Sequence, residues 1–182
     1  MKALGWLSVA LMASGAAVAQ TPLEAEAQDI TEAFMLSLKS SLTASLQEGG
    51  PVEAIQHCQH LAPSLAEQFT RKGWQVGRTS LKLRNPKNAP DEWELAQLLS
   101  FAQRLEQGDK PAELFASQEQ GGEFRYMQAI VVGKPCLACH GESLTPEITQ
   151  ILDARYPQDK ARGYTAGQLR GAFTLRKTLN EP

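Results

Sequence analysis

The chain has 182 residues, a formal net charge of −2 and 42% hydrophobic residues, which suits a globular domain with an ordinary core. The small acidic charge gives no reason to expect nucleic acid or an anionic membrane surface as a partner. The three cysteines, Cys58, Cys136 and Cys139, leave at least one outside any intramolecular disulfide. The cysteines are therefore the first candidates for functional residues.

The first 19 residues have the pattern of a secretory signal peptide. A single positive charge, Lys2, precedes an apolar run over 4–18 that ends in the small-x-small sequence Ala17-Val18-Ala19. A retained membrane anchor is the alternative, but a spanning helix needs about 20 apolar residues and this run is shorter. We therefore expect cleavage after Ala19, a periplasmic location without stable membrane insertion, and a single mature domain over 20–182.

Two long helices are expected at the start of the mature chain. Thr21-Pro22-Leu23-Glu24 has the form of a capping box with proline at the first helical position, and apolar residues at helical spacing continue to about residue 47. Gly49-Gly50 ends this helix, and Pro51 opens a second helix that runs to about residue 72. Pro63 lies inside the second helix and predicts a kink there, because proline has no amide hydrogen to donate.

The remaining sequence alternates between strands and shorter helices. Strands bounded by turn residues are expected over 74–83, 112–115, 123–132 and 171–178, and helices over 91–106 and 145–154. Gly77 predicts a bulge in the first strand, and Gln120-Gly121-Gly122 predicts a hairpin turn. The pattern indicates one α/β (α+β) domain, in which long N-terminal helices precede a central antiparallel sheet that carries an inserted cysteine motif.

Cys136-Leu137-Ala138-Cys139-His140 has the spacing used to attach c-type haem. Two intervening residues let both sulfurs add to the vinyl groups of one porphyrin, and the next residue presents an imidazole to the iron. The alternatives are a thioredoxin-type redox pair, a structural zinc site and a plain disulfide. A redox pair usually opens a helix in a βαβ setting, zinc needs four ligands, and a disulfide leaves His140 without a role. In an exported chain the motif predicts one covalently attached haem c.

The second axial position of the iron has several candidate ligands by atom type: Cys58, His57, His60, Met35 and Met127. At about 100° per residue, Cys58 falls in the apolar stripe of its helix, whereas His57 and His60 lie about 100° or more from the stripe centre. We expect Cys58 to point into the core and the two histidines to point towards solvent. A buried cysteine without a ligand role is an equally simple interpretation of this spacing, so the second ligand stays open at this level.

Several further motifs follow one another along the mature chain. They are Ala54-Ile55-Gln56-His57-Cys58 through Ala62-Pro63, Arg78 to Lys82 followed by Arg84 to Asn88, Trp93-Glu94, Cys136 to Gly141, and Tyr156-Pro157 through Gly163-Tyr164 to Arg170-Gly171-Ala172. Together they resemble a family of exported c-type haem proteins with a PAS-like fold. The resemblance implies a PAS-like domain whose haem iron is held by His140 and, on the opposite side, by Cys58. Ligation by two histidines remains the alternative if the helix is rotated.

Basic residues near these motifs are candidates to bind the haem propionates. Arg78 and Arg84 lead this group, with Lys82 and Arg170, because guanidinium groups suit carboxylates. Ordinary surface charge is the alternative for each of them. The cofactor-binding residues expected from the sequence are thus Cys136, Cys139, His140, Cys58, Arg78 and Arg84, with His140 and Cys58 as the iron ligands.

A thiolate opposite histidine stabilises ferric iron and predicts a low reduction potential. Loss of the Cys58 bond on reduction would open a position for CO or NO. We therefore expect a redox or diatomic-gas sensor module that acts through a redox or signalling protein partner, with a small electron-carrying cytochrome as the alternative. An enzyme is not expected, because Cys58 would block the position that a haem enzyme leaves open.

Overall fold

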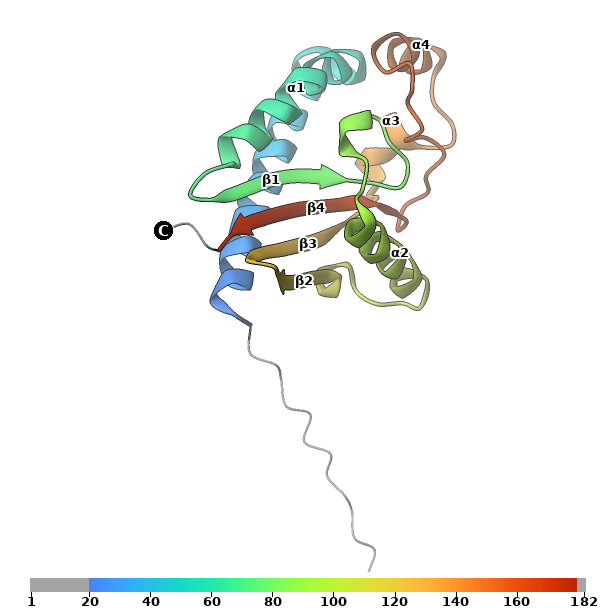
Figure 1. Ribbon diagram of the computed structural model, residues 1–182. Coiled ribbons are helices and arrows are strands. Elements are labelled where there is room, and N and C mark those ends of the chain that lie inside the picture. Colours follow the sequence, from blue (N-terminus) through green and yellow to red (C-terminus); the bar gives the residue numbers. More distant parts are fainter. Residues whose placement is uncertain (1–19, 180–182) are drawn as a thin grey trace, which may run out of the picture.

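The computed structural model describes residues 20–179, so the predicted signal peptide over 1–19 lies outside the described residues. The elements in chain order are α1 (Pro22–Phe69), β1 (Trp74–Thr79), η1 (Pro86–Asn88), α2 (Glu92–Glu106), η2 (Pro111–Glu113), β2 (Phe115–Gln120), β3 (Glu123–Val131), η3 (Lys134–Cys136), α3 (Leu137–His140), α4 (Pro146–Arg155) and β4 (Leu169–Thr178). Figure 1 shows an α+β arrangement of a long N-terminal helix and one sheet. Among the described residues, no helix is both long and apolar enough to cross a membrane.

The sheet has the strand order β1-β4-β3-β2, and every neighbouring pair is antiparallel. β2 and β3 form the predicted hairpin. The predicted bulge at Gly77 is wrong, because β1 pairs with β4 without a register shift along its whole length. A Cβ at Gly77 would meet the Thr174 side chain at an ordinary 3.6 Å, so nothing there forces an irregular backbone. The register shifts instead between Ile130 and Val131, where β3 approaches the cysteine motif.

Two strand boundaries differ from the prediction. β1 ends at Thr79 rather than near residue 83. Just beyond it the Ser80 hydroxyl lies within hydrogen-bond distance of the Lys82 and Arg170 backbone oxygens. The predicted strand over 112–115 is also wrong. Pro111 instead opens a 3-10 turn, for which its fixed φ is suited, and β2 begins at Phe115.

α1 begins at the predicted capping box and breaks at the predicted glycines. The Glu24 amide donates to the Thr21 hydroxyl at 3.2 Å, and the Thr21 amide donates to the Glu24 carboxylate at 2.8 Å. Gly50, with φ 71° and ψ −168°, is the non-helical residue within α1. It divides the helix into a first arm, residues 22–49, and a second arm, residues 51–69. The second arm is not split at Pro63, because it keeps helical angles through that residue, and the predicted kink there stays a prediction.

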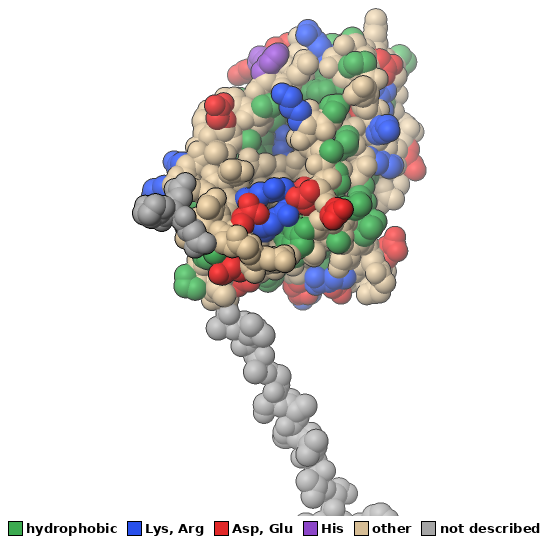
Figure 2. All heavy atoms as spheres, viewed as in Figure 1, with side chains coloured by type: hydrophobic (Ala, Val, Ile, Leu, Met, Phe, Trp, Pro, Cys, Tyr) green, Lys and Arg blue, Asp and Glu red, His purple; other side chains and the backbone are tan. Residues whose placement is uncertain are grey.

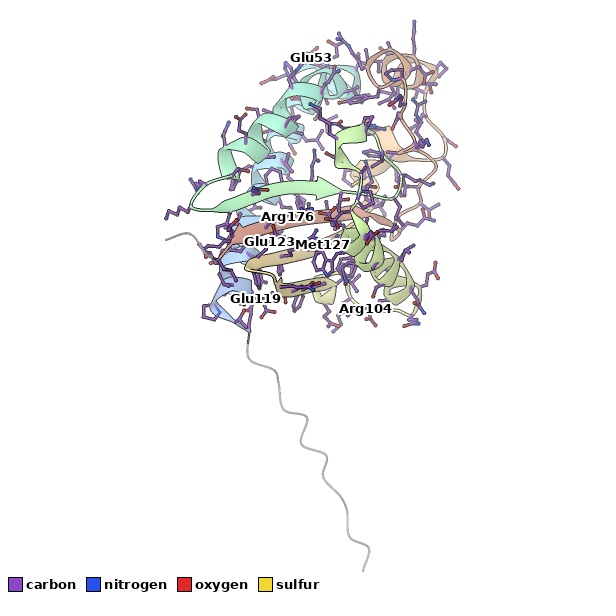
Figure 3. The ribbon with its side chains drawn as sticks, viewed as in Figure 1. Glu53, Arg104, Glu119, Glu123, Met127 and Arg176 are labelled. Carbon is purple, nitrogen blue, oxygen red and sulfur yellow. The ribbon has the colours of Figure 1, made fainter. Side chains whose placement is uncertain are left out.

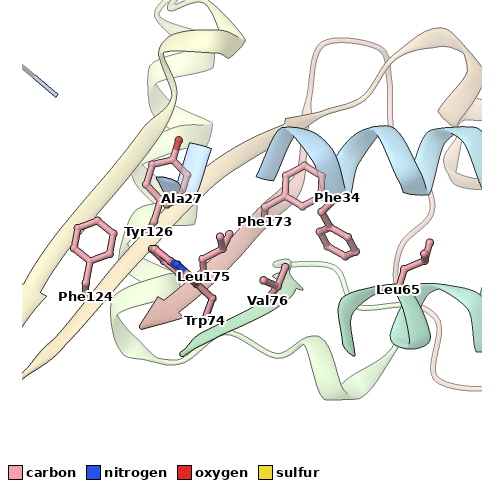
Figure 4. Close-up of a cluster of buried hydrophobic side chains, with 9 residues drawn as sticks. All are labelled: Ala27, Phe34, Leu65, Trp74, Val76, Phe124, Tyr126, Phe173 and Leu175. Carbon is pink, nitrogen blue, oxygen red and sulfur yellow. The ribbon is translucent and has the colours of Figure 1, made fainter. Parts of the chain in front are cut away.

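The hydrophobic core lies on both faces of the sheet. The first arm covers one face, where aromatic side chains from the helix and three strands meet (Figure 4): Phe34, Trp74, Phe124, Tyr126 and Phe173. α2 covers part of the other face, where Leu98 and Phe101 join a cluster with Met127. Tyr126 and Met127 are neighbours on β3 but belong to different clusters, because successive side chains of a strand point to opposite faces.

A network of ion pairs fastens the start of α2 to the sheet. Asp91, the N-cap of α2, lies 2.7 Å from Arg125 and 2.6 Å from Arg176. Glu94 is only 4% exposed and accepts a hydrogen bond from the Thr174 hydroxyl at 2.7 Å. Basic and acidic side chains meet on this face of the molecule in Figure 2, and Figure 3 labels Arg176 over β4. The network accounts for the fixed position of α2 beside β3 and β4.

The start of the second arm, α3 and α4 lie near the end of the sheet where β1 and β3 end and β4 begins (Figure 1). The later part of the arm packs on the sheet through Leu65. An apolar cluster joins the start of the arm to α4: Ile55 of the second arm packs with Ile148 and Leu152 of α4. Cys139 and Tyr156 pack against this cluster. The fold therefore brings the second arm, which carries Cys58, to the cysteine motif that follows β3.

Candidate haem site

The cysteine motif forms a tight helical stretch directly after β3. Lys134–Cys136 make a 3-10 turn, and Leu137–His140 make a single turn of α-helix. Cys136 and Cys139 are three positions apart on this stretch and therefore lie towards the same side. Both are free, half-buried thiols. This placement suits two bonds from the chain to one flat ligand.

His140 is oriented by a backbone oxygen. Its Nδ1 lies 2.6 Å from the Ala161 oxygen, and since a carbonyl only accepts, Nδ1 carries the hydrogen and donates. Burial, with the positive charges of Arg84 and Arg170 adding to it, lowers the pKa of His140 to about 3. The ring is therefore neutral at pH 7, and its Nε2 is left with a lone pair for a metal bond.

The segment over 159–164 runs beside the motif and supports it. The Tyr164 amide donates to the His140 oxygen at 3.0 Å, and the Gly163 amide donates to the Gly141 oxygen at 3.0 Å. The Tyr164 ring meets the His140 ring edge-on, with 6.3 Å between centroids. The backbone and the ring of the histidine are thus both held by this segment.

Arg84 joins the same segment to the cysteine turn. Its Nη2 donates to the Cys139 oxygen at 2.6 Å, and its guanidinium pairs with the Asp159 carboxylate at 3.2 Å. The structure thus places Arg84 at the motif, but its donors are directed to protein acceptors. Its predicted pairing with a haem propionate stays a prediction.

Cys58 lies on the second arm, one helical turn after Ile55, whose cluster includes Cys139. Its side chain is half-buried rather than part of the hydrophobic core, which differs from the expectation that it points into the core. Burial raises the pKa of the Cys58 thiol, and the positive charges of Arg78 and Arg84 act against that rise. Cys58 therefore faces the basic side of the site, and its role as an iron ligand stays a prediction.

The other candidate ligands lie elsewhere. His57 and His60 are exposed, as predicted, and His57 binds Glu53 at 3.3 Å on the outer side of the helix. Met127 is buried in the cluster under α2, and Met35 packs against the aromatic cluster on the other face of the sheet. Neither methionine belongs to the clusters that include Cys136 and Cys139.

Arg78 and Arg170 add further positive charge beside the motif. The Arg170 Nη1 donates to the Ser80 hydroxyl at 2.8 Å, and its guanidinium lies 5.6 Å from the centre of the Tyr164 ring. Arg78 projects from β1, and burial, together with the charge of Arg170, lowers its pKa. Among residues 20–179 no carboxylate forms a salt bridge with either guanidinium, which favours an anionic partner. The assignment of Arg78 to a propionate stays a prediction.

The sequence patterns did not single out Asp159 or Ala161. Asp159 contacts Arg84 across a separation of 75 positions, and Ala161 contacts His140 across 21. A local motif does not reveal contacts of this range. The stretch Asp159-Lys160-Ala161-Arg162-Gly163 also resembles an ordinary polar loop.

The donor set suits haem. In the described part of the chain, no three or more His, Cys, Asp and Glu side chains come together in a group able to hold a metal ion, and a structural zinc site uses four such ligands. Two thiols on one helical turn, a neutral imidazole and a basic surround match a porphyrin with vinyl groups, a central iron and two carboxylates.

Comparison with known proteins agrees with this description of the fold. The model of the Tll0287-like family matches residues 17–177. Among solved structures, the chain is similar to the cyanobacterial heme-protein Tll0287, with a TM-score of 0.67 and 24% sequence identity over 90% of this chain and 99% of that one. No curated protein matches. At that identity the structural likeness shows the fold, whereas the family model spans most of the sequence. The chain belongs to the Tll0287-like family.

Proposed function

We propose that this protein is an exported c-type haem protein with a PAS-like fold that senses redox state or a diatomic gas. The observation that carries the proposal is the His140 ring, held at 2.6 Å by the Ala161 oxygen directly after two free thiols on one helical stretch. A proximal histidine needs this arrangement, because the hydrogen bond at Nδ1 leaves Nε2 for the iron. The similar solved structure is of a protein named a heme-protein, which supports the same cofactor here.

The roles of the side chains follow from their chemistry. Cys136 and Cys139 bond covalently to the vinyl groups, and His140 and Cys58 are the two iron ligands. When bound, the haem would supply one-electron chemistry and, if the Cys58 bond is lost, a binding position for CO or NO. The sulfur of Cys58 brings negative charge, which favours ferric iron and a low reduction potential.

The second arm offers a route for a signal. Cys58 lies on this arm, which Gly50 separates from the first arm, and the Ser45 hydroxyl meets His57 Nδ1 at 3.2 Å across the break. A change in the bond to Cys58 would therefore act on a helical arm that also contacts the first arm through Phe69 and Phe34. We propose that a redox or signalling protein in the periplasm reads this change.

Expression of the full chain in a bacterial periplasm with a c-type haem maturation system tests attachment and export. We expect one haem per chain that resists acid–acetone extraction, and a secreted N-terminus at Gln20. Haem that is extracted from the protein would contradict covalent attachment. A secreted chain that keeps residues 1–19 would contradict cleavage after Ala19.

Replacement of the proposed second ligand tests ligation and the sensor role together. In Cys58→Ala, we expect the ferric protein to lose its thiolate absorption features, whereas His60→Ala, at an exposed position, leaves them in place. An unchanged Cys58→Ala spectrum would rule out Cys58 as a ligand. If the wild-type haem keeps both ligands on reduction and binds no CO, the electron carrier is the better description.

A further inference from the structure

Asp159 is a buried residue of the segment over 159–164, and its carboxylate accepts several hydrogen bonds. Its side chain is 0% exposed. One carboxylate oxygen, Oδ1, accepts the Ala161 amide at 2.9 Å and Arg84 Nε at 3.2 Å. The other, Oδ2, accepts Arg84 Nη2 at 3.2 Å and Arg162 Nε at 2.8 Å. Four donors therefore converge on a single carboxylate that has no contact with solvent.

Two of the three residues that supply these donors, Ala161 and Arg84, also contact the motif. Ala161, whose amide is held by Asp159, accepts the His140 Nδ1 hydrogen at its own oxygen, 2.6 Å away. Arg84, whose guanidinium is held by Asp159, donates to the Cys139 oxygen at 2.6 Å. One carboxylate thus controls both the acceptor for the imidazole and the donor to the cysteine turn.

We propose that Asp159 is a positioning residue of the haem site, which orients His140 through Ala161 and the cysteine turn through Arg84 and so helps to determine the reduction potential. The inference rests on the haem proposed above. Residues that orient a metal-bound histidine from outside the ligand set commonly change its affinity or activity tenfold or more when replaced. Asp159 is placed for this role although it is neither a ligand nor part of the Cys-x-x-Cys-His motif.

The expected direction of the effect follows from charge. The Asp159 carboxylate balances the Arg84 guanidinium, which lies within hydrogen-bond reach of the Cys139 backbone. In Asp159→Asn that positive charge is left without its partner and disfavours the ferric state, which carries one more positive charge than the ferrous state. The Ala161 backbone is also held less firmly, so its oxygen forms a weaker hydrogen bond with His140 Nδ1 and polarises the imidazole less. Both effects raise the reduction potential.

Asp153 provides a matched control. It pairs with Arg162 at 2.7 Å, as Asp159 does at 2.8 Å, but it is 64% exposed. Asp153→Asn thus removes the same charge from the same arginine without touching Ala161 or Arg84. We expect Asp159→Asn to shift the ferric–ferrous equilibrium about tenfold towards ferrous iron, about 59 mV for one electron, and Asp153→Asn to shift it less than about twofold. Redox titration of the haem absorption measures both.

Arg84→Lys separates geometry from charge. Lysine keeps the positive charge but has one ammonium group in place of the fork that reaches Asp159 and Cys139 together. We expect a shifted or broadened ferric EPR spectrum and a lower fraction of chains with attached haem. If Asp159→Asn fails to accumulate as a folded protein by circular dichroism, Arg84→Lys alone decides the inference.

The outcomes separate the inference from the proposed function. A wild-type protein without haem would refute the proposed function itself. A wild-type protein with haem, together with an unchanged potential and EPR spectrum in the tested variants, would refute the role of Asp159. A shift of equal size in Asp153→Asn would show a general charge effect and would also overturn the positioning role.

Discussion

Two carboxylates, Asp91 and Asp159, each bind two arginines and one backbone amide. Asp91 does so at the start of α2, with Arg125 and Arg176, and Asp159 does so beside the cysteine motif. Burial alone would raise the pKa of both, but hydrogen bonds from backbone amides and arginines hold the pKa of each below its ordinary value. Their ionised forms therefore stabilise the fold at neutral pH.

The contribution of Asp91 is expected to depend on pH. Because its folded pKa lies below the unfolded value of about 3.9, the ionised carboxylate adds stability above that pH, and the gain is lost as the pH falls through the folded pKa. Wild type should exceed Asp91→Asn in free energy of unfolding at pH 7 and pH 5, with the difference shrinking below about pH 4. Urea titrations at these pH values measure the difference. A constant difference down to pH 3 would contradict the prediction.

At the scale of elements, the break in α1 places Cys58. The first arm packs on the sheet. The second arm joins the same cluster through Leu65, and through Ile55 near its start it packs on α4 and reaches the motif. Gly50 allows both because its φ of 71° and ψ of −168° lie in a region that is essentially restricted to glycine. A straight helix in its place would carry residues 51–69 along the axis of the first arm.

Replacement of this glycine tests the importance of the break. A Cβ at Gly50 would meet nothing within 4 Å, so the cost of Gly50→Ala comes from the backbone alone and is expected to be about 1–3 kcal/mol. Gly77→Ala is the control, since its Cβ would make an ordinary 3.6 Å contact in an unbroken strand pair. We expect no loss of stability for Gly77→Ala. Urea unfolding of both variants provides the comparison, and equal stabilities would argue against a required break.

At the scale of the whole molecule, the core and the candidate site are separate. The two larger apolar clusters lie on the faces of the sheet, under both arms of α1 and under α2. The clusters that include Cys139 and Cys136 lie beyond the end of the sheet. The sheet clusters therefore include none of the residues 136–140 of the motif, although Leu65 of the second arm links the two regions.

This separation predicts how the chain behaves without its cofactor. We expect a Cys136→Ala, Cys139→Ala double variant to fold and to protect the amides of β1, β3 and β4 from hydrogen exchange as the haem-loaded protein does. The amides over 133–164 should exchange faster, because their support includes the cofactor in the loaded protein. Hydrogen exchange with mass spectrometry measures both regions. Loss of protection in the sheet strands would show that core and site fold as one unit.

The sequence by itself determined the features that depend on neighbours a few positions apart. The capping box at Thr21, the break at Gly49-Gly50, the β2–β3 hairpin and the one-turn spacing of Cys136 and Cys139 are such features. The local signal at Gly77 was wrong, because the pairing of β1 with β4 outweighed the preference of a single residue. The family motifs also predicted Cys58 and His140 as iron ligands, but they could not predict how the two side chains are placed.

Only the tertiary structure decided what surrounds the motif. The Arg84–Asp159 pair spans 75 positions and the His140–Ala161 hydrogen bond spans 21, so neither has a periodic or motif signal. Ile55 of the second arm packs with Ile148 of α4, and Cys139 packs against the same cluster although it lies far from Ile55 in the sequence. These contacts form because β1 and β3 finish at the same end of the sheet. Burial there strengthens the interaction of a carboxylate with its arginines. The cysteine motif can be found in one stretch of sequence, whereas the contacts of Asp159 beside it appear only in the tertiary structure.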